Sequence, residues 1–369
     1  MPASADLVIV SSPLQYLNAV EWRRRRPDRA VDLVLLGDRA GGGAAIDLLM
    51  ARAPSLWRSV RRCEGRPRSS RKAPKILRDA IDLQHRARLR RLAASLAGGG
   101  YAALAFGDYR NRSQRELVDR IAHAELTLLD DGSITPQAAR CRAGEPTPDP
   151  SRFADRWLRT RLARALFGGD RPIDPPRLTF FTIYGALIEP TLRPGDRVER
   201  HAFESWRTDA PARSGDEVWL LGANHVEAGI ACFETHRRLI VEGVAALRRV
   251  GFHGPVLYRP HRGEDRSAAE ALARAAGARF EPSITPVELA YLDAPVKPAA
   301  VAVVASSAAD TLSVIDPKLP IVRFALPEGY LKRQRDHILA VVRAHDAFIK
   351  RLRVIEPCDA PVHRSLAIR

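Results

Sequence analysis

Leu7-Val-Ile-Val10 and the turn that follows it, Ser11-Ser-Pro-Leu-Gln15, decide the fold of this chain. Four consecutive apolar residues predict a strand buried on both faces, and the turn predicts a helix that begins at Leu14. Repeats of this strand, turn and helix predict a parallel sheet covered by helices on both faces. The further strands predicted in this half of the chain lie at 31–36, 102–106 and 126–129.

The second half of the chain repeats this pattern after a segment, between about 185 and 215, in which prolines and glycines cluster. A helix is also predicted at 153–167. We therefore expect an α/β protein of two Rossmann-like domains that face each other across a cleft, the GT-B architecture. The expected parts are an N-terminal domain at 1–190, a C-terminal domain at 215–328 and a final helical segment at 329–369 that packs back on the first domain.

Composition places the chain among globular proteins. It has 369 residues, of which 46% are hydrophobic and 28% charged, enough for two domains with substantial cores. Its four cysteines lie far apart without a Cys-x-x-Cys pair, so neither a disulfide framework nor a zinc site is predicted. No basic segment precedes Leu7, and the apolar run there is too short for a signal peptide or a membrane span. These features predict a cytoplasmic protein.

The net charge of +16 is concentrated between Arg58 and Arg91, where 13 Lys and Arg residues accompany three acids. One interpretation is a solvated helix face with its loop, and another is a surface for an anionic membrane or polymer. Aromatic residues are not interleaved there and no nucleic-acid-binding motif is present, so we expect no nucleic-acid partner. Peripheral attachment to the inner membrane is a hypothesis that follows from this charge.

Two adjacent acids follow the strand predicted at 126–129. Asp130 and Asp131 precede Gly132, which allows a tight turn and lets one carboxylate face a ligand. Partial burial and a like-charged neighbour both raise the pKa of a carboxyl group, which suits a general base. Asp-Asp-Gly is also common at ordinary turns, so that interpretation stays open.

His261 follows Pro260 at another predicted strand end, between Arg259 and Arg262. Proline fixes the direction of the ring, and the flanking guanidinium groups favour a bound phosphate. The phosphate in turn favours the imidazolium, from which His261 donates to a departing phosphate oxygen. A surface histidine in a basic loop is the alternative.

Ser306 and Ser307 end a third apolar run and begin a predicted helix. Their hydroxyls, the free amide groups and the positive end of the helix dipole predict a phosphate site, although serine is also an ordinary N-cap. Gly222 and Asn224 follow the strand predicted at 217–221 and are assigned to the same donor side of the site.

The opening turn supplies three more polar residues, Ser12, Gln15 and Asn18, that we expect in the cleft together with Gly132. The dinucleotide fingerprint Gly-x-Gly-x-x-Gly is absent from this turn, which disfavours an NAD-binding start. The chain also has neither a Walker A sequence nor a nucleophile elbow.

Three segments taken in order resemble the motifs of the bacterial sialyltransferases. They are Leu128-Leu-Asp-Asp-Gly-Ser133, Tyr258-Arg-Pro-His-Arg262 and Ala305-Ser-Ser-Ala308. The separation of 131 residues between the acid and the histidine is most similar to the bacterial polysialyltransferase group. The opening, Val8-Ile-Val-Ser-Ser-Pro-Leu-Gln-Tyr-Leu-Asn-Ala-Val-Glu21, is similar to the start of that group and of the lipooligosaccharide sialyltransferases.

The resemblance implies an inverting transferase of capsule or lipopolysaccharide biosynthesis. Its donor is a CMP-activated nonulosonic acid such as CMP-sialic acid, its acceptor is a glycan or glycolipid hydroxyl, and it needs neither a metal nor another cofactor. Asp130 is then the general base, with Asp131 as the alternate. His261 is the acid at the CMP phosphate, which Ser306 and Ser307 hold. Two details differ from the family pattern, because the histidine follows its proline and the first acid is Asp where polysialyltransferases often have Glu.

Two alternatives stay open. The first is a GT-B transferase that uses CMP-Kdo or a nucleotide diphosphate sugar. The second is a non-catalytic basic protein that binds a polymer or a membrane. The collection of an acid, an imidazole and hydroxyls at strand ends argues against a scaffold, which has no need to gather them.

Overall fold

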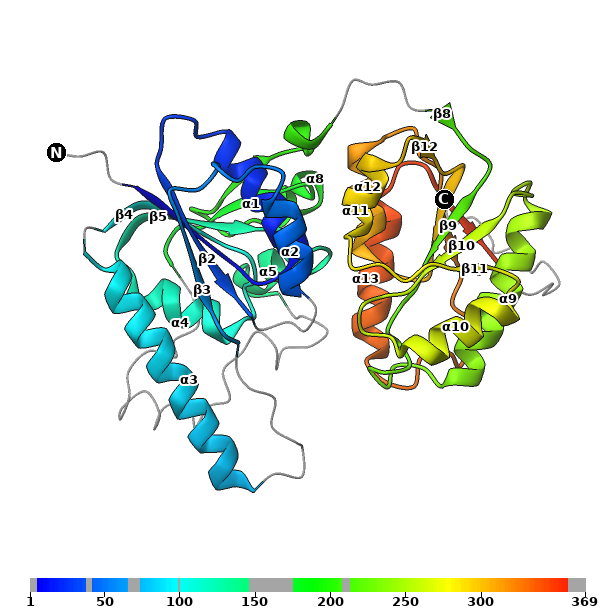
Figure 1. Cartoon of the computed structure of the whole chain (residues 1–369), viewed down its shortest axis with the longest axis horizontal. Coiled ribbons are helices and arrows are strands. Elements are labelled where there is room, and N and C mark those ends of the chain that lie inside the picture. Colours follow the sequence, from blue (N-terminus) through cyan, green and yellow to red (C-terminus); the bar gives the residue numbers. More distant parts are fainter. Residues whose placement is uncertain are drawn as a thin grey trace. The chain divides into compact units, whose positions relative to one another are not determined.

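The computed structural model describes residues 5–37, 42–65, 74–98, 100–145, 175–207 and 213–357. The chain forms two compact units, Met1–Thr208 and Asp209–Arg369, each built on a parallel sheet (Figure 1). The helix expected at 153–167 lies outside the described residues. Among the helices that are described, none combines the length and the apolar character needed to cross a lipid bilayer.

The first unit contains a seven-stranded parallel sheet in the order β3-β2-β1-β4-β5-β6-β7. Its strands are β1 (Asp6–Val10), β2 (Val31–Leu36), β3 (Ser59–Cys63), β4 (Tyr101–Phe106), β5 (His123–Leu129), β6 (Thr179–Thr182) and β7 (Arg197–Arg200). Every residue of β1 and β2 is buried, as continuous apolar runs predict for strands covered on both faces. The edge strand β3 exposes its central residues.

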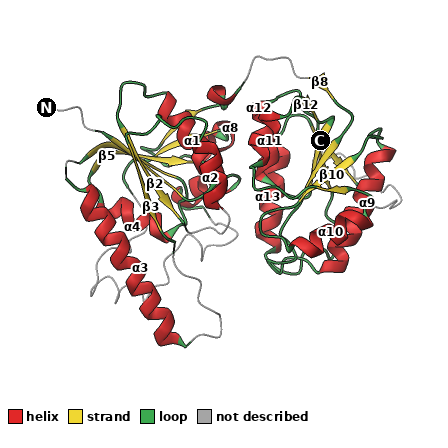
Figure 2. Cartoon of the chain, in the orientation of Figure 1, coloured by secondary structure: helices red, strands yellow, loops and turns green. Residues whose placement is uncertain are grey.

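Helices lie on both faces of this sheet (Figure 2). They are α1 (Pro13–Arg24), α2 (Gly42–Met50), α3 (Lys75–Leu96), α4 (Arg112–Arg120), α5 (Ile134–Arg142) and α8 (Gly185–Ile188), with the short 3-10 helices η1 (Glu189–Thr191) and η2 (Glu204–Trp206). α1 contacts α2, and α3 contacts α4. α1 begins at Pro13, which costs no hydrogen bond because the first N–H groups of a helix have no partner within it.

The second unit contains a six-stranded parallel sheet in the order β11-β10-β9-β13-β14-β15. Its strands are β9 (Val218–Leu221), β10 (Val256–Arg259), β11 (Arg279–Phe280), β13 (Ala300–Val303), β14 (Ile321–Phe324) and β15 (Leu352–Ile355), and β8 (Arg213–Ser214) pairs separately with β12 (Val296–Lys297). The helices are α9 (Phe233–Arg249), α10 (Arg266–Ala275), α11 (Val287–Asp293), α12 (Ser307–Ile315) and α13 (Arg335–Phe348). One apolar core joins β9, β10, β13 and β14 to α9 and α10.

Both sheets contain a point at which the strand order reverses. β1 lies between β2 and β4 in the first sheet, and β9 lies between β10 and β13 in the second. Parallel sheets bind ligands at such points, outside the carboxyl ends of the strands, because the two loops leave in opposite directions. A ligand is therefore expected at the loops after β1 and β4 in the first unit, and at the loops after β9 and β13 in the second.

Two boundaries differ from those predicted. The first unit extends beyond residue 190, because β7 joins its sheet and Trp206 Nε1 donates to Leu17 O at 3.3 Å. The final segment, expected to be helical, contains α13 followed by a strand, Leu352–Ile355, which pairs in parallel with β14. Its Val and Ile favour an extended chain. The expected packing of this segment on the first domain stays a prediction.

Candidate functional site

In the first unit, the loop after β1 is held by its own polar side chains. Ser12 caps α1, and its Oγ accepts a hydrogen bond from Gln15 N at 3.3 Å. Gln15 Oε1 accepts from Ser11 N at 2.8 Å. All three residues are buried, and the Gln15 amide keeps its two N–H groups for other loops.

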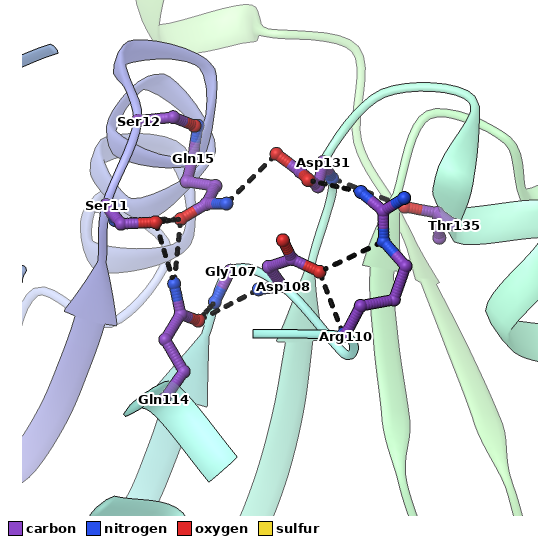
Figure 3. A network of polar contacts seen from close by, with 9 residues as sticks. All are labelled: Ser11, Ser12, Gln15, Gly107, Asp108, Arg110, Gln114, Asp131 and Thr135. Carbon is purple, nitrogen blue, oxygen red and sulfur yellow. Dashed lines mark hydrogen bonds and ion pairs between the residues drawn. The ribbon is translucent and has the colours of Figure 1, made fainter. Parts of the chain in front are cut away.

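Gln114, near the start of α4, joins this loop to the loop after β4 (Figure 3). Its Oε1 accepts from the backbone N–H groups of Gly107 and Asp108 at 2.8 and 2.9 Å. Its Nε2 donates to Ser11 Oγ and Gln15 Oε1, both at 3.1 Å. One buried amide thus satisfies four groups from two loops. The sequence does not predict this role for Gln114, whose only signal is a place in the first turn of the helix that follows the strand predicted at 102–106.

Asp131 is the carboxylate at which these loops meet. Gln15 Nε2 donates to Asp131 Oδ1 at 2.9 Å, and Arg110 Nη2 lies 3.4 Å from Asp131 Oδ2 (Figure 3). Arg110 Nε also lies 3.4 Å from Asp108 Oδ1. The structure therefore brings the predicted residues Gln15 and Asp131 into contact. It also places Arg110, which the sequence did not indicate, between Asp108 and Asp131.

Asp130, in contrast, is buried, with 2% of its surface exposed. Its Oδ2 accepts from Ile183 N at 2.7 Å, and Asn18 Nδ2 lies 3.4 Å from the Asp130 backbone oxygen. Within the described residues, Asp130 Oδ1 has no hydrogen-bond partner. The predicted residues Asn18 and Asp130 are in contact, but the carboxylate is more deeply buried than we expected.

A second buried group, His201, lies beside Asp130, with Nε2 3.8 Å from Asp130 Oδ2. Burial raises the pKa of Asp130 to about 7, and the charge of Asp131 adds to this rise while the hydrogen bond from Ile183 N opposes it. Burial lowers the pKa of His201 to about 3. The His201 ring is stacked on Phe181 with centroids 4.3 Å apart. Both shifts favour the uncharged form of the group.

Gly132 turns the chain away from these two acids. Its φ is 70°, in the left-handed region that favours glycine, as a tight turn requires. Thr135 N donates to Gly132 O at 3.1 Å, and Asp131 N donates to Thr135 Oγ1 at 3.4 Å. The turn directs Asp130 and Asp131 to different surroundings, Asp130 buried against Ile183 and Asp131 partly exposed between Gln15 and Arg110.

In the second unit, Gly222 lies where the loops after β9 and β10 come close together. A Cβ added there would lie 2.1 Å from Glu264 Oε2, 2.8 Å from Tyr258 Oη and 2.9 Å from His261 N. Tyr258 Oη donates to Glu264 Oε1 at 2.6 Å, and His261 N donates to Glu264 Oε2. A side chain at Gly222 would displace this arrangement, so glycine is required for the close approach.

His261 is oriented by its own loop. Gly263 N donates to His261 Nδ1 at 3.0 Å, so Nδ1 is the acceptor and the neutral ring carries its proton on Nε2. Burial, together with the positive charge of Arg262, lowers the pKa of His261 to about 4. The imidazolium expected from the sequence depends on a bound phosphate and stays a prediction, whereas burial by the protein itself favours a neutral ring that donates from Nε2.

The other residues predicted on the donor side lie around His261. A Cβ added at Gly263 would lie 3.1 Å from Asn224 Nδ2 and 3.2 Å from His261 Nδ1, so both side chains flank this glycine. Arg262 is exposed beside them. The loops after β9 and β10 thus collect an amide, an imidazole and a guanidinium at one edge of the sheet.

Ser306 and Ser307 follow β13, the other neighbour of β9. Ser306 is the N-cap of α12, its Oγ accepting from Ala308 N at 3.3 Å, and Ser307 is the first residue of the helix. The capping role that we had left open is therefore present. A capped helix still presents the positive end of its dipole, so the role does not exclude an anion at this position.

A buried cluster of His225, His236 and Tyr330 connects the loop after β9 to α9. Tyr330 Oη lies 2.9 Å from His225 Nδ1 and 2.7 Å from His236 Nδ1. Because a tyrosine hydroxyl has one proton, one ring accepts from it and the other donates to it. Burial lowers the pKa of both histidines to about 4, so both rings are neutral near pH 7. The shared hydroxyl connects this loop to α9.

The structure therefore divides the predicted residues between the two units, and in the second unit Ser306 and Ser307 follow β13, which β9 separates from the β10 strand that precedes His261. The first unit contains Ser12, Gln15, Asn18, Asp130, Asp131 and Gly132, and the second contains Gly222, Asn224, His261, Arg262, Ser306 and Ser307. In the part of the chain that the structure describes, no group of three or more His, Cys, Asp or Glu residues is arranged to hold a metal ion.

Comparisons with known proteins bear on the fold. No protein-family model and no curated protein matches the sequence. The crystal structure of TcCGT1 in complex with UDP matches with a TM-score of 0.54 and 11% identity, over 98% of this chain and 88% of that chain. The S. aureus MnaA–UDP co-structure matches with a TM-score of 0.53 and 6% identity, over 94% of this chain and 88% of that chain.

At identities this low, the two matches establish a shared fold and nothing further. Both matches extend over both units of the chain, and each unit is a parallel sheet with a reversal of strand order at its centre. The chain has the GT-B fold, with two Rossmann-like α/β domains, as the sequence predicted.

Proposed function

We propose that this protein is a glycosyltransferase that takes its sugar from a nucleotide-activated donor. The GT-B fold supports the proposal, as does the UDP bound in both matching structures. The observation that carries it lies in the second unit. There Gly263 N donates a hydrogen bond to His261 Nδ1. The neutral ring therefore carries its proton on Nε2, at the carboxyl edge of the sheet, where parallel sheets bind ligands.

In the proposed reaction, an acceptor hydroxyl oxygen attacks the anomeric carbon of the donor while the bond from that carbon to the phosphate oxygen breaks. A single displacement of this kind inverts the configuration. Negative charge grows on the departing phosphate, where His261 donates a hydrogen bond from Nε2. Arg262 and the N-terminus of α12 at Ser306 and Ser307 favour the same charge.

The proton of the acceptor hydroxyl goes to a carboxylate of the first unit. We assign this role to Asp131, because its side chain is 9% exposed and is oriented by Gln15 and Arg110, whereas Asp130 is only 2% exposed. A base must first be within reach of the proton it removes, and its pKa matters second. Asp130, with a pKa near 7, then controls the charge next to Asp131.

Two donor classes are candidates within this proposal. The opening segment and the three motifs favour a CMP-activated nonulosonic acid such as CMP-sialic acid, with a glycan or glycolipid as the acceptor. The UDP in both matching structures favours a nucleotide diphosphate sugar. The cytoplasmic location expected from the sequence is part of the proposal.

A nucleotide panel tests the proposal. Thermal unfolding is followed with CMP, CTP, UDP and GDP, and release of the nucleotide from the matching sugar donors is then measured. A selective rise in melting temperature with CMP or CTP assigns the first donor class, and one with UDP assigns the second. No shift with any nucleotide, together with salt-sensitive binding to a polyanion, would instead identify a non-catalytic basic protein.

A further inference from the structure

The N-terminal half of α3 exposes apolar side chains. Ile76 is 84% exposed, Leu77 51% and Leu83 49%. Eight large hydrophobic side chains are exposed in the described part of the chain, and three of them fall within these eight consecutive residues. Single exposed apolar residues are normal, but a concentration of them on one element marks an interaction site.

Among the described residues, the contacts that anchor α3 in the first unit come from its C-terminal half. His85, Leu89, Ala93 and Leu96 are buried, and His85 Nε2 lies 2.9 Å from Ser113 Oγ at the start of α4. The N-terminal half extends past the body of the unit (Figure 1). This half therefore gains little from packing on the domain that carries it.

The exposed apolar residues form a stripe. Ile76, Ala80 and Leu83 are spaced by four and three residues, so they share one face of the helix, with Leu77 beside them. Ile76 and His85 are nine residues apart, roughly two and a half turns, so the stripe and the buried face lie on opposite sides. The apolar stripe thus faces away from the unit.

The same helix is strongly basic. It contains six Lys and Arg residues and two acids. Four of these cations lie at 86–91, C-terminal to the stripe, whereas the N-terminal half carries Lys75 and Arg78 together with Asp79 and Asp82. Counted from Arg58 to Arg91, the chain has 13 cations and three acids, so basic residues flank the stripe on both sides. An apolar stripe flanked by basic residues binds interfaces through buried apolar area together with attraction to anionic lipids.

We propose that the N-terminal half of α3 docks on an anionic lipid bilayer, with Ile76, Leu77 and Leu83 in contact with the acyl region. An anionic polymer would satisfy the arginines and leave the apolar stripe in water. A second copy of this chain would bring two strongly positive surfaces together, which repel. The bilayer is the partner that matches both features. This proposal does not depend on the transferase activity.

Flotation of the full chain with vesicles tests it. We expect binding to vesicles that contain phosphatidylglycerol to exceed binding to pure phosphatidylcholine vesicles by about tenfold or more, and to weaken at high salt. The triple variant Ile76→Ser, Leu77→Ser, Leu83→Ser should lose about tenfold in binding while its melting temperature stays that of the wild type. Ile284→Ser, which changes a 67% exposed residue of the second unit, is the matched control and should bind normally.

Two outcomes would overturn the proposal. Wild-type binding by the triple variant would show that the stripe does not enter the bilayer. A wild-type dimer in sedimentation that the triple variant breaks would assign the stripe to a second copy. As a direct readout, the emission of Leu77→Trp, taken as the difference from the wild type, should shift to shorter wavelength with anionic vesicles, and an unchanged spectrum would also count against it.

Discussion

Asp130 Oδ2 lies 3.8 Å from His201 Nε2, and both side chains are shielded from water. Burial raises the pKa of the acid to about 7 and lowers the pKa of the base to about 3. Each shift favours the neutral form, so the folded protein holds two uncharged groups side by side. Loss of the Asp130 proton would place a negative charge on a buried carboxylate, and the hydrogen bond that Ile183 N donates to its Oδ2 at 2.7 Å offsets only part of that cost.

This relationship predicts how stability depends on pH. Folded Asp130 holds its proton up to about pH 7, whereas the unfolded residue releases it near its ordinary pKa of 3.8. The contribution of Asp130 to the free energy of unfolding is therefore fully present below pH 3.8. It is lost as the pH rises to 7, and the loss is about 4 kcal/mol at most. Asp130→Asn removes this loss. We expect the variant to gain stability relative to the wild type between pH 4.5 and 7.5, measured by urea unfolding, and an equal difference at both pH values would contradict the shift.

The two acids are predicted to differ in catalysis. Asp131→Asn should lower the transfer rate by about 10²–10⁴-fold with nucleotide binding unchanged, because it removes the proposed base. Asp130→Asn should lower the rate less and should move the pH profile, because it removes a titrating neighbour. Steady-state rates from pH 5.5 to 9 separate these outcomes. If Asp130→Asn is the more damaging change and Asp131→Asn is mild, the roles are reversed.

The tautomer of His261 makes a further prediction. Because its pKa is about 4, the ring is neutral above pH 5.5 and should donate from Nε2 throughout the neutral range. His261→Gln keeps an N–H near that position and should retain more activity than His261→Leu, for which we expect a loss of about 10²-fold. A wild-type kcat/KM that falls tenfold per pH unit above 6.5, and does not do so in His261→Gln, would instead indicate a catalytic imidazolium.

Gly222 should tolerate no side chain. Gly222→Ala puts a methyl group against Glu264, Tyr258 and the His261 backbone, so we expect a loss of about 1–3 kcal/mol in stability and weaker nucleotide binding. Gly43→Ala is the control, because a Cβ there meets nothing within 4 Å and its helical position favours alanine by about 0.5–1 kcal/mol. Calorimetry with and without nucleotide measures both effects, and a neutral Gly222→Ala would disprove the close approach of the loops.

The central strands were predictable from the sequence because they are buried on both faces. Continuous apolar runs such as 7–10 and 102–106 are typical of strands that helices cover on both faces. The strand ends were predictable for the same reason, and they led to Asp131, Gly222 and His261. The alternation of such runs with helices also predicted the two parallel sheets.

Edge strands and buried polar partners were not predictable. β7 reads Arg197-Val-Glu-Arg200, with no apolar run, so His201 at its end carried no signal. Gln114 is a polar residue on a helix, and only the folded chain shows that it reaches Ser11 across the sheet. The tautomer of His261 depends on the backbone of Gly263, a contact that no side-chain pattern encodes.

Every strand pair in the two main sheets is parallel, so each unit separates its framework from its chemistry. The strands and helices form the framework, and the connections that follow the strands carry Asp131 and His261, the two groups proposed to transfer or donate a proton. Exchange of the connections after β9 and β10 for those of another GT-B protein would replace the groups proposed to contact the donor without touching the apolar core. The proposed donor preference could therefore be changed by exchanging loops alone.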